Sequence, residues 1–260
     1  MRKEVSRLST PAAFAGSSIH SNALILRLDP DDPDAEGNEI EAIANAHIEP
    51  IADALAEQLA AVAASEATVS GITRIADALP SQRLREALEA LLTESSGRGV
   101  RVAADNLSTV NIGVNWRLVN EMARSWAQTY SYELVSYINS NSRQFIADSL
   151  AGWVQSGAPL SDLIDQLSVR FDSTRARLIG VTESTRAFAS GTLATYESAG
   201  FAMRPPEDQI PPRHISCRCW ISLRDNGDGT WDYVWLTAQD DRVCPLCGPR
   251  HLQSIGVAKA

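Results

Sequence analysis

The chain has 260 residues, of which 44% are hydrophobic and 21% are charged, and its formal net charge is −9. This length is enough to bury the core of one large or two small domains, and the negative balance disfavours non-specific binding to nucleic-acid phosphates over the whole surface. The apolar runs are shorter than a membrane-spanning helix needs, so we expect a soluble chain without a membrane partner.

Residues 1–38 are predicted to form an extended or flexible arm. They contain Pro11, Gly16 and a run of aspartates and prolines from Asp29 to Asp34, and such residues disfavour regular helix. The first residues are basic, but polar residues and Pro11 follow them instead of the apolar stretch of a signal peptide. A secretory leader is therefore not expected. The aspartate run also lacks the glycine and terminal glutamate that an EF-hand calcium loop requires.

Acidic residues are concentrated near this arm. From residue 27 to residue 66 the chain carries eleven acidic residues against one basic residue, a charge of −10, which leaves the remainder of the chain at about +1. Such a segment forms a solvated surface, or alternatively it repels DNA or binds a basic partner.

Residues 39–200 are predicted to form a helical domain, because apolar residues recur at three- and four-residue steps. The expected helices span residues 39–64, 69–78, 81–94, 115–138, 142–154, 160–167 and 172–199. Pro50 is expected to kink or break the first helix, Asn115 to cap the fourth, and Asp172 or Ser173 to open the last. We interpret the tryptophan and leucine stripes as helix packing rather than as a cofactor site. Glu183 and Arg186 are expected to form an exposed ion pair that contributes about 0.2–0.5 kcal/mol.

Residues 201–260 are predicted to form a small zinc-bound hairpin domain. Two runs rich in aromatic and β-branched residues, 220–223 and 231–237, flank a turn sequence at 226–229 that reads Asn-Gly-Asp-Gly. The predicted fold class is therefore mainly α, with a helical body and a small C-terminal β-hairpin (α+β overall).

The four cysteines of the chain flank this hairpin as two close pairs. An antiparallel hairpin brings its two ends together, and four thiolates there can bind one ion tetrahedrally. We therefore predict a structural zinc whose ligands are Cys217, Cys219, Cys244 and Cys247. Two disulfides, free thiols and a redox Cys-x-x-Cys pair are the alternatives.

Histidines and arginines lie close to the cysteine pairs in the sequence. His214 and His251 are each near enough to replace one cysteine as a ligand, or they make ordinary surface hydrogen bonds. Four thiolates leave a charge of about −2 on a zinc site, and nearby arginines are expected to offset it and to donate hydrogen bonds to the sulfurs. These arginines are Arg213, Arg218, Arg242 and Arg250.

A catalytic metal is disfavoured, because four thiolates leave no open position for water. The zinc-deaminase signature is also missing its glutamate, since Ile215 and Ser216 follow His214. An enzyme would need an open ligand position and a base, for which Asp240 and Asp241 are the only nearby residues. A zinc-ribbon nucleic-acid module using the arginines would show steeply salt-dependent DNA binding, which the acidic balance disfavours.

Three stretches resemble one family. Residues 181–191, followed by Ala199-Gly200, resemble the Thr-Glu-containing helix of the phage Mu F-like head morphogenesis (minor head protein) family. Residues 211–219 resemble its Pro-x-His-x-x-Cys-Arg-Cys box, and residues 235–248 resemble its Trp-x-x-x-x-Asp-x-x-x-Cys-x-x-Cys box. The resemblance covers residues 115–248. The family usually places the two cysteine boxes in the opposite order, but the ends of a hairpin can exchange order and keep the same metal geometry.

The resemblance implies a minor structural head protein of a tailed phage or prophage. Such a protein would dock to the portal and major capsid proteins during head assembly and DNA packaging or ejection, with transient contact to packaged DNA. It would lie in the virion, inside the capsid, or in the host cytoplasm during assembly, and it would have neither enzymatic activity nor a small-molecule substrate. The alternative is a zinc-dependent enzyme, hydrolase or toxin-like, because Mu F-like regions can be fused to toxin or transferase domains.

Overall fold

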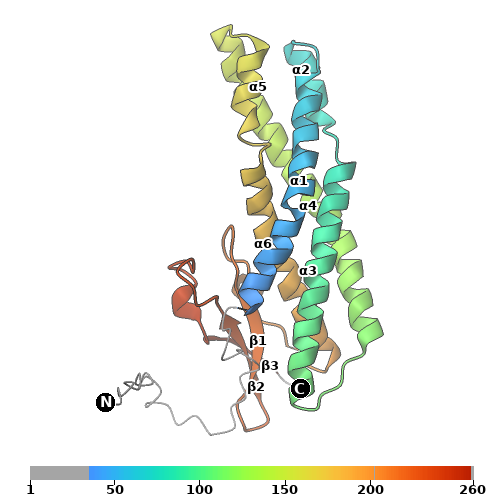
Figure 1. Ribbon diagram of the computed structural model, residues 1–260, viewed down its shortest axis with the longest axis vertical. Coiled ribbons are helices and arrows are strands. Elements are labelled where there is room, and N and C mark those ends of the chain that lie inside the picture. Colours follow the sequence, from blue (N-terminus) through green and yellow to red (C-terminus); the bar gives the residue numbers. More distant parts are fainter. Residues whose placement is uncertain (1–34, 202, 259–260) are drawn as a thin grey trace, which may run out of the picture.

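The computed structural model describes residues 35–201 and 203–258, and its architecture is mainly helical with a small C-terminal sheet (Figure 1). This confirms the predicted fold class. The helices are α1 (Ala35–Ala63), α2 (Val69–Asp77), α3 (Gln82–Thr109), α4 (Trp116–Ser156), α5 (Leu160–Ser168) and α6 (Ser173–Ser198). The strands are β1 (Trp220–Asp225), β2 (Trp231–Leu236) and β3 (Ser254–Ala258), and two short 3-10 helices lie at Glu207–Gln209 and Gly248–Arg250.

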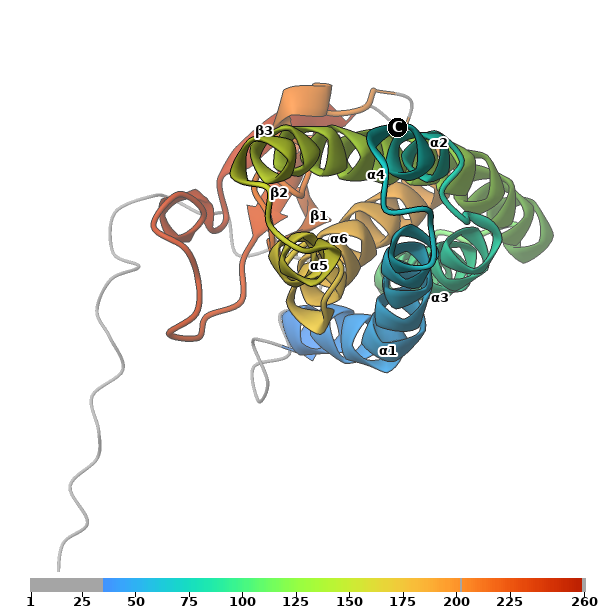
Figure 2. The ribbon, with the colours of Figure 1, turned by 90° about the horizontal axis from the view of Figure 1, so that it is seen from above.

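The long helices form an elongated bundle, and the sheet lies at one end of it (Figure 1). Viewed from above, α6 lies between α1, α3 and α4, and it contacts all three (Figure 2). Two predicted helix starts are confirmed by their caps. The Asn115 side chain accepts a hydrogen bond from the Leu118 N–H at 3.2 Å, and that of Asp172 accepts one from the Arg175 N–H at 2.9 Å.

The N-terminal region differs from the prediction at its boundary. Helix α1 begins at Ala35, so residues 35–38 are helical, and the rest of the expected arm lies outside the described residues. Pro50 lies inside α1 without ending it. Ile40, Leu55 and other apolar side chains on both sides of Pro50 are fully buried, so packing on both sides of the proline outweighs the loss of one backbone hydrogen bond.

The central region also differs, because one helix, α4, replaces the two expected at 115–138 and 142–154. The polar residues at the expected break face partners on other helices. The Gln58 Nε2 group donates to Asn139 Oδ1 at 2.8 Å, and Arg175 donates to the buried Ser142 hydroxyl at 3.0 Å. Tertiary contacts therefore satisfy side chains that the sequence pattern assigns to a loop. Helix α3 likewise runs to Thr109, well beyond the expected end at 94.

The sheet has the order β1-β2-β3 with antiparallel pairs. The predicted hairpin is confirmed, with Trp220 opposite Leu236 and Asp225 opposite Trp231, and β3 is an addition that sequence patterning missed. The sheet packs on the helices through two hydrophobic clusters, the larger of which includes residues from both sides of the predicted boundary at 200. Its members from the helices include Ala103, Leu107, Leu193 and Tyr196, and those from the sheet include Ile221, Tyr233 and Trp235. None of the described helices is both long and apolar enough to cross a bilayer.

Helices α3 and α6 approach closely enough for backbone to touch backbone. A Cβ atom added at Gly99 would lie 2.1 Å from the Phe188 carbonyl oxygen, and one added at Gly191 would lie 2.0 Å from the Ser96 carbonyl oxygen. No side chain fits at either position without separating the two helices.

We therefore expect Gly99→Ala to lower the free energy of unfolding by about 1–3 kcal/mol or more, through overpacking. Gly97→Ala is the matched control, because its Cβ would meet only the end of the Arg101 side chain, at 4.0 Å. The control should be stabilising by about 0.5–1 kcal/mol, since alanine favours helix over glycine. Urea unfolding followed by circular dichroism measures both. Equal effects of the two changes would contradict the close contact.

Candidate metal centre

Side chains from two loops meet beside the sheet. Cys217 and Cys219 come directly before β1, whereas Cys244 and Cys247 follow β2. Two groups of donor atoms, each within 4.8 Å of one another, share the Cys247 sulfur. One group is His214, Cys244 and Cys247, and the other is Cys217, Cys219 and Cys247. The hairpin thus brings the two cysteine pairs to its same end, as the sequence predicts, and the cluster could hold a metal ion.

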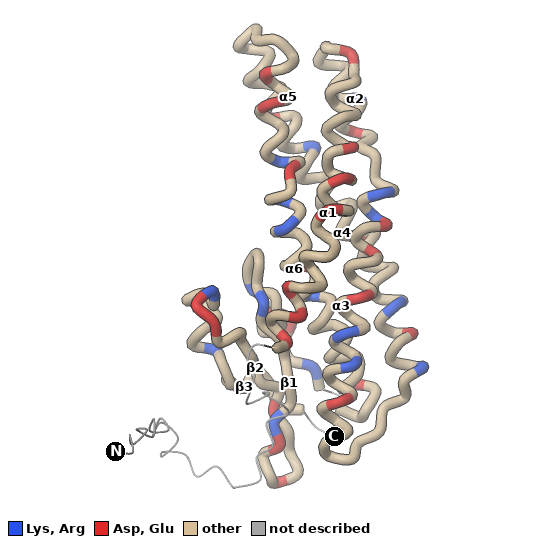
Figure 3. Tube along the Cα trace, in the orientation of Figure 1, with Lys and Arg blue, Asp and Glu red and all other residues tan. Residues whose placement is uncertain are grey.

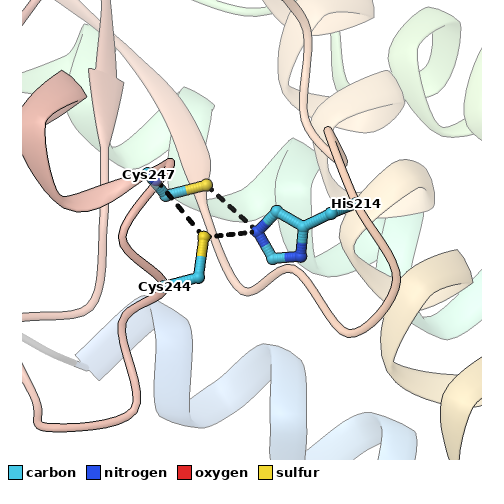
Figure 4. A group of neighbouring side chains, drawn as sticks. All are labelled: His214, Cys244 and Cys247. Carbon is cyan, nitrogen blue, oxygen red and sulfur yellow. Dashed lines mark hydrogen bonds between the residues drawn. The ribbon is translucent and has the colours of Figure 1, made fainter.

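His214 and His251, which the sequence left undecided, have different surroundings. The His214 Nε2 atom lies 2.9 Å from the Cys244 sulfur and 3.1 Å from the Cys247 sulfur (Figure 4). The His251 Nδ1 atom instead lies 3.0 Å from the Gln239 amide nitrogen and 3.3 Å from the Thr237 backbone nitrogen. Among the described residues, His251 belongs to neither donor group.

All four cysteines are free thiols, and three of them are almost inaccessible to solvent. Cys217, Cys219 and Cys247 are 0%, 4% and 1% exposed. Hydrogen bonding to Cys217 raises the pKa of both Cys219 and Cys247, and burial raises each further. Hydrogen bonds with Cys219 and Cys247 lower the pKa of Cys217 to about 2. The three sulfurs therefore resist carrying more than one negative charge by themselves, and a cation among them would remove that resistance.

Helix α6 anchors the loop that carries His214 and Cys217. The Ser216 N–H donates to the Thr182 hydroxyl oxygen at 2.9 Å, and the Thr185 hydroxyl donates to the Cys217 carbonyl oxygen. Both threonines belong to the stretch at 181–191 that resembles the Thr-Glu helix, although the sequence alone did not indicate this role. The sequence carries no distinct signal for this role, because a helical threonine hydroxyl can equally bond a carbonyl of its own helix, as that of Thr182 does with Leu178.

A network of carboxylates and guanidinium groups joins the two loops that carry the donor cysteines, here called the metal loops, to α1 and α6. Arg218 binds Asp240 through two bonds of 2.8 and 2.9 Å, and Arg242 binds both Asp240 and Glu41. Glu41 also accepts a hydrogen bond from Arg177 of α6 at 2.8 Å. Figure 3 shows acidic positions along α1 close to basic positions of the neighbouring elements. We call Glu41, Arg218, Asp240 and Arg242 the ionic clamp.

The clamp bears on two expectations. Arg218 and Arg242 bind carboxylates, and Arg250 stacks on the Trp235 ring at 4.1 Å and donates to Gln209, so these three arginines have partners other than the sulfurs. Within the acidic window Glu41 binds arginines of the chain itself, whereas Asp29 to Asp34 lie outside the described residues. These pairs connect residues about 140 to 200 positions apart, which sequence spacing could not reveal.

The Glu183–Arg186 pair forms as predicted, but it is not exposed. The Glu183 side chain is 10% exposed, and its carboxylate accepts hydrogen bonds from Arg186 at 3.0 Å and from the Tyr130 hydroxyl at 3.1 Å. Burial raises the pKa of Glu183, against the opposing effects of Arg186 and Tyr130. The helix face that carries this carboxylate packs toward α4, which is why the exposed-pair expectation was wrong.

An open groove of about 590 Å³ lies between α4 and α6 near Glu183. Apolar side chains that include Leu134, Ile138 and Phe145 line it, and the exposed Ile215 of the metal loop lines it as well. Arg170 and Arg175 also line the groove, and neither forms an ion pair with any carboxylate in the part of the chain that the structure describes. Burial, together with the charge of Arg170, lowers the pKa of Arg175. Asp148, Glu183 and Arg186 line the groove too, so this surface combines apolar contact area with charges of both signs.

Comparison with protein-family models, with curated proteins and with solved structures finds no match to this chain.

We expect Asp240→Asn to lower the free energy of unfolding by about 1–3 kcal/mol, because it leaves the Arg218 guanidinium, 9% exposed, with only the longer contact to Glu41 at 3.5 Å. Hydrogen bonds with Arg218 lower the pKa of Asp240 to about 2. A lowered folded-state pKa means that the carboxylate stabilises the fold above about pH 4 and that this contribution is lost as the pH falls toward 2. The variant should lack this part of the pH dependence.

Urea unfolding of the metal-loaded protein between pH 7 and pH 3 measures the effect. Asp241→Asn is the matched control, because Asp241 is exposed and forms no ion pair among the described residues; its effect should stay within about 0.5 kcal/mol. Similar losses in the two variants would contradict a specific role of Asp240.

Proposed function

We propose that the cluster binds one zinc ion and that the ion has a structural role. Thiolate and imidazole donors favour zinc, and structural zinc sites use four such ligands. The sheet that the ion would support is small, with three strands of five or six residues. Asp240, a nearby candidate for a general base, forms ion pairs with two arginines. These features support a staple rather than a catalytic centre, and we propose that the chain is not an enzyme.

We further propose that the chain is a minor head protein of a tailed phage or prophage. The observation that carries this proposal is that the three stretches resembling the Mu F-like family meet at one centre. Thr182 and Thr185 of the first stretch bind the loop of the second, and Arg218 of the second binds Asp240 of the third. The reversed order of the two cysteine stretches fits this arrangement, because both flank the same end of one hairpin.

In this proposal the protein acts by docking to the portal and major capsid proteins, and zinc and the ionic clamp keep the sheet fixed on the bundle. We assign the α4–α6 groove to the contact, because apolar walls beside Arg170, which forms no ion pair among the described residues, suit an apolar partner segment that carries an acidic side chain. The protein would be present inside the capsid, or in the host cytoplasm during assembly. It would make at most transient contact with packaged DNA and would need neither a membrane nor a small-molecule substrate.

The zinc proposal predicts one zinc ion per purified chain by elemental analysis. Cys247→Ser should abolish binding, because Cys247 belongs to both donor groups. Loss of zinc should lower the free energy of unfolding by about 3 kcal/mol or more and expose residues 203–258 to protease. His251→Ala is the control and should retain the ion. Protein that is fully folded, protease-resistant and free of metal would contradict the proposal.

The docking proposal predicts that the chain is retained in procapsids when it is co-expressed with the portal and major capsid proteins of the same phage or prophage genome. Arg170→Glu should reduce its copy number per particle about tenfold, through charge repulsion from an acidic segment. Arg117→Glu, at another exposed position of the bundle, should leave the copy number unchanged. Quantitative mass spectrometry of purified procapsids measures the copy number. Absence of the chain from the particles would overturn the assignment.

A further inference from the structure

The metal centre offers five donor side chains, whereas a structural zinc ion takes four. The four cysteines alone would satisfy the ion, so the position of His214 among the sulfurs needs an explanation. This inference rests on the proposed zinc site and concerns which side chains bind the ion.

A small, partly open pocket marks where an ion fits. A cavity of about 20 Å³ lies within the cluster, which is room for one water-sized particle. Four of the five donors line it, namely His214, Cys219, Cys244 and Cys247. Cys217 does not line the cavity. It is fully buried, and its sulfur lies within 4.8 Å of the Cys219 and Cys247 sulfurs.

The orientation of the His214 ring supports its role as a ligand. Its Nδ1 atom lies 2.8 Å from the carbonyl oxygen of Ile215. A carbonyl oxygen only accepts hydrogen bonds, so Nδ1 carries the proton and the Nε2 lone pair is directed at the cysteine sulfurs. Metal-binding histidines are commonly fixed in this way, with the second ring nitrogen donating to a backbone carbonyl.

The charges around the site favour the same set of ligands. Four thiolates would leave about −2 on a zinc site, whereas three thiolates and one neutral imidazole leave about −1. Arg218 and Arg242 are already bound to Asp240 and Glu41. Because these arginines are engaged with carboxylates, the less charged set requires less compensation.

We propose that His214, Cys219, Cys244 and Cys247 bind the ion, and that Cys217 is not a ligand. Cys217 instead remains buried beside the sulfurs of Cys219 and Cys247.

X-ray absorption at the zinc edge of the full-length protein tests the ligand set without any mutation. The expected result is three sulfur ligands at about 2.3 Å and one nitrogen ligand at about 2.0–2.1 Å. A shell of four sulfurs overturns the inference and leaves the zinc proposal intact. Absence of zinc from the purified protein overturns both.

Cobalt binding to variants identifies which cysteine is not a ligand. Cys217→Ala and Cys219→Ala are a matched pair of buried cysteines two residues apart. Cys217→Ala should keep one cobalt ion per chain, with the wild-type visible spectrum and an affinity within about threefold. Cys219→Ala and His214→Ala should each weaken binding at least about 100-fold and change the spectrum. Loss of the ion in Cys217→Ala, with retention in His214→Ala, overturns the assignment.

Discussion

The burial of α6 on most of its circumference is the constraint on which the rest of the structure depends. One face of this helix touches the backbone of α3, and this contact requires glycine at position 191. Other faces pack against α1 and α4, and threonine hydroxyls hold the metal loop. A helix in this position cannot show a simple amphipathic stripe, because it has no broad solvent face. Its small and hydroxyl-bearing residues follow from that position.

The joint between the bundle and the sheet is built from two unlike kinds of interaction. The hydrophobic cluster around Tyr196 and Tyr233 provides contact area without fixing an orientation. The ionic clamp is directional, because guanidinium–carboxylate hydrogen bonds depend on angle, and the metal coordination proposed for the donor cluster would be directional as well. The combination lets a small sheet hold a defined position on a long bundle, as the proposed docking role requires.

Much of the fold could be predicted from the sequence where the signal is local. Asn115 and Asp172 cap helices as expected, the turn at 226–229 joins β1 to β2, and the cysteine pairs meet at one end of the hairpin. The failures share one physical cause. The continuity of α4, the burial of Glu183 and the ionic clamp depend on partners that are distant in the sequence. Local periodicity and residue spacing therefore cannot predict them. Strand β3 is short and gains its pairing only from β2.

The β1–β2 turn lies at the opposite end of the hairpin from the metal loops, about 20 Å away along six-residue strands (Figure 1). Gly227, Asp228 and Gly229 are exposed there, and both glycines have positive φ values. Exposed turn tips of this kind accept insertions with little effect on a fold. The turn is therefore a natural place for an epitope tag or a fluorophore, which would report where the protein is located while leaving the donor cluster, the clamp and the groove untouched.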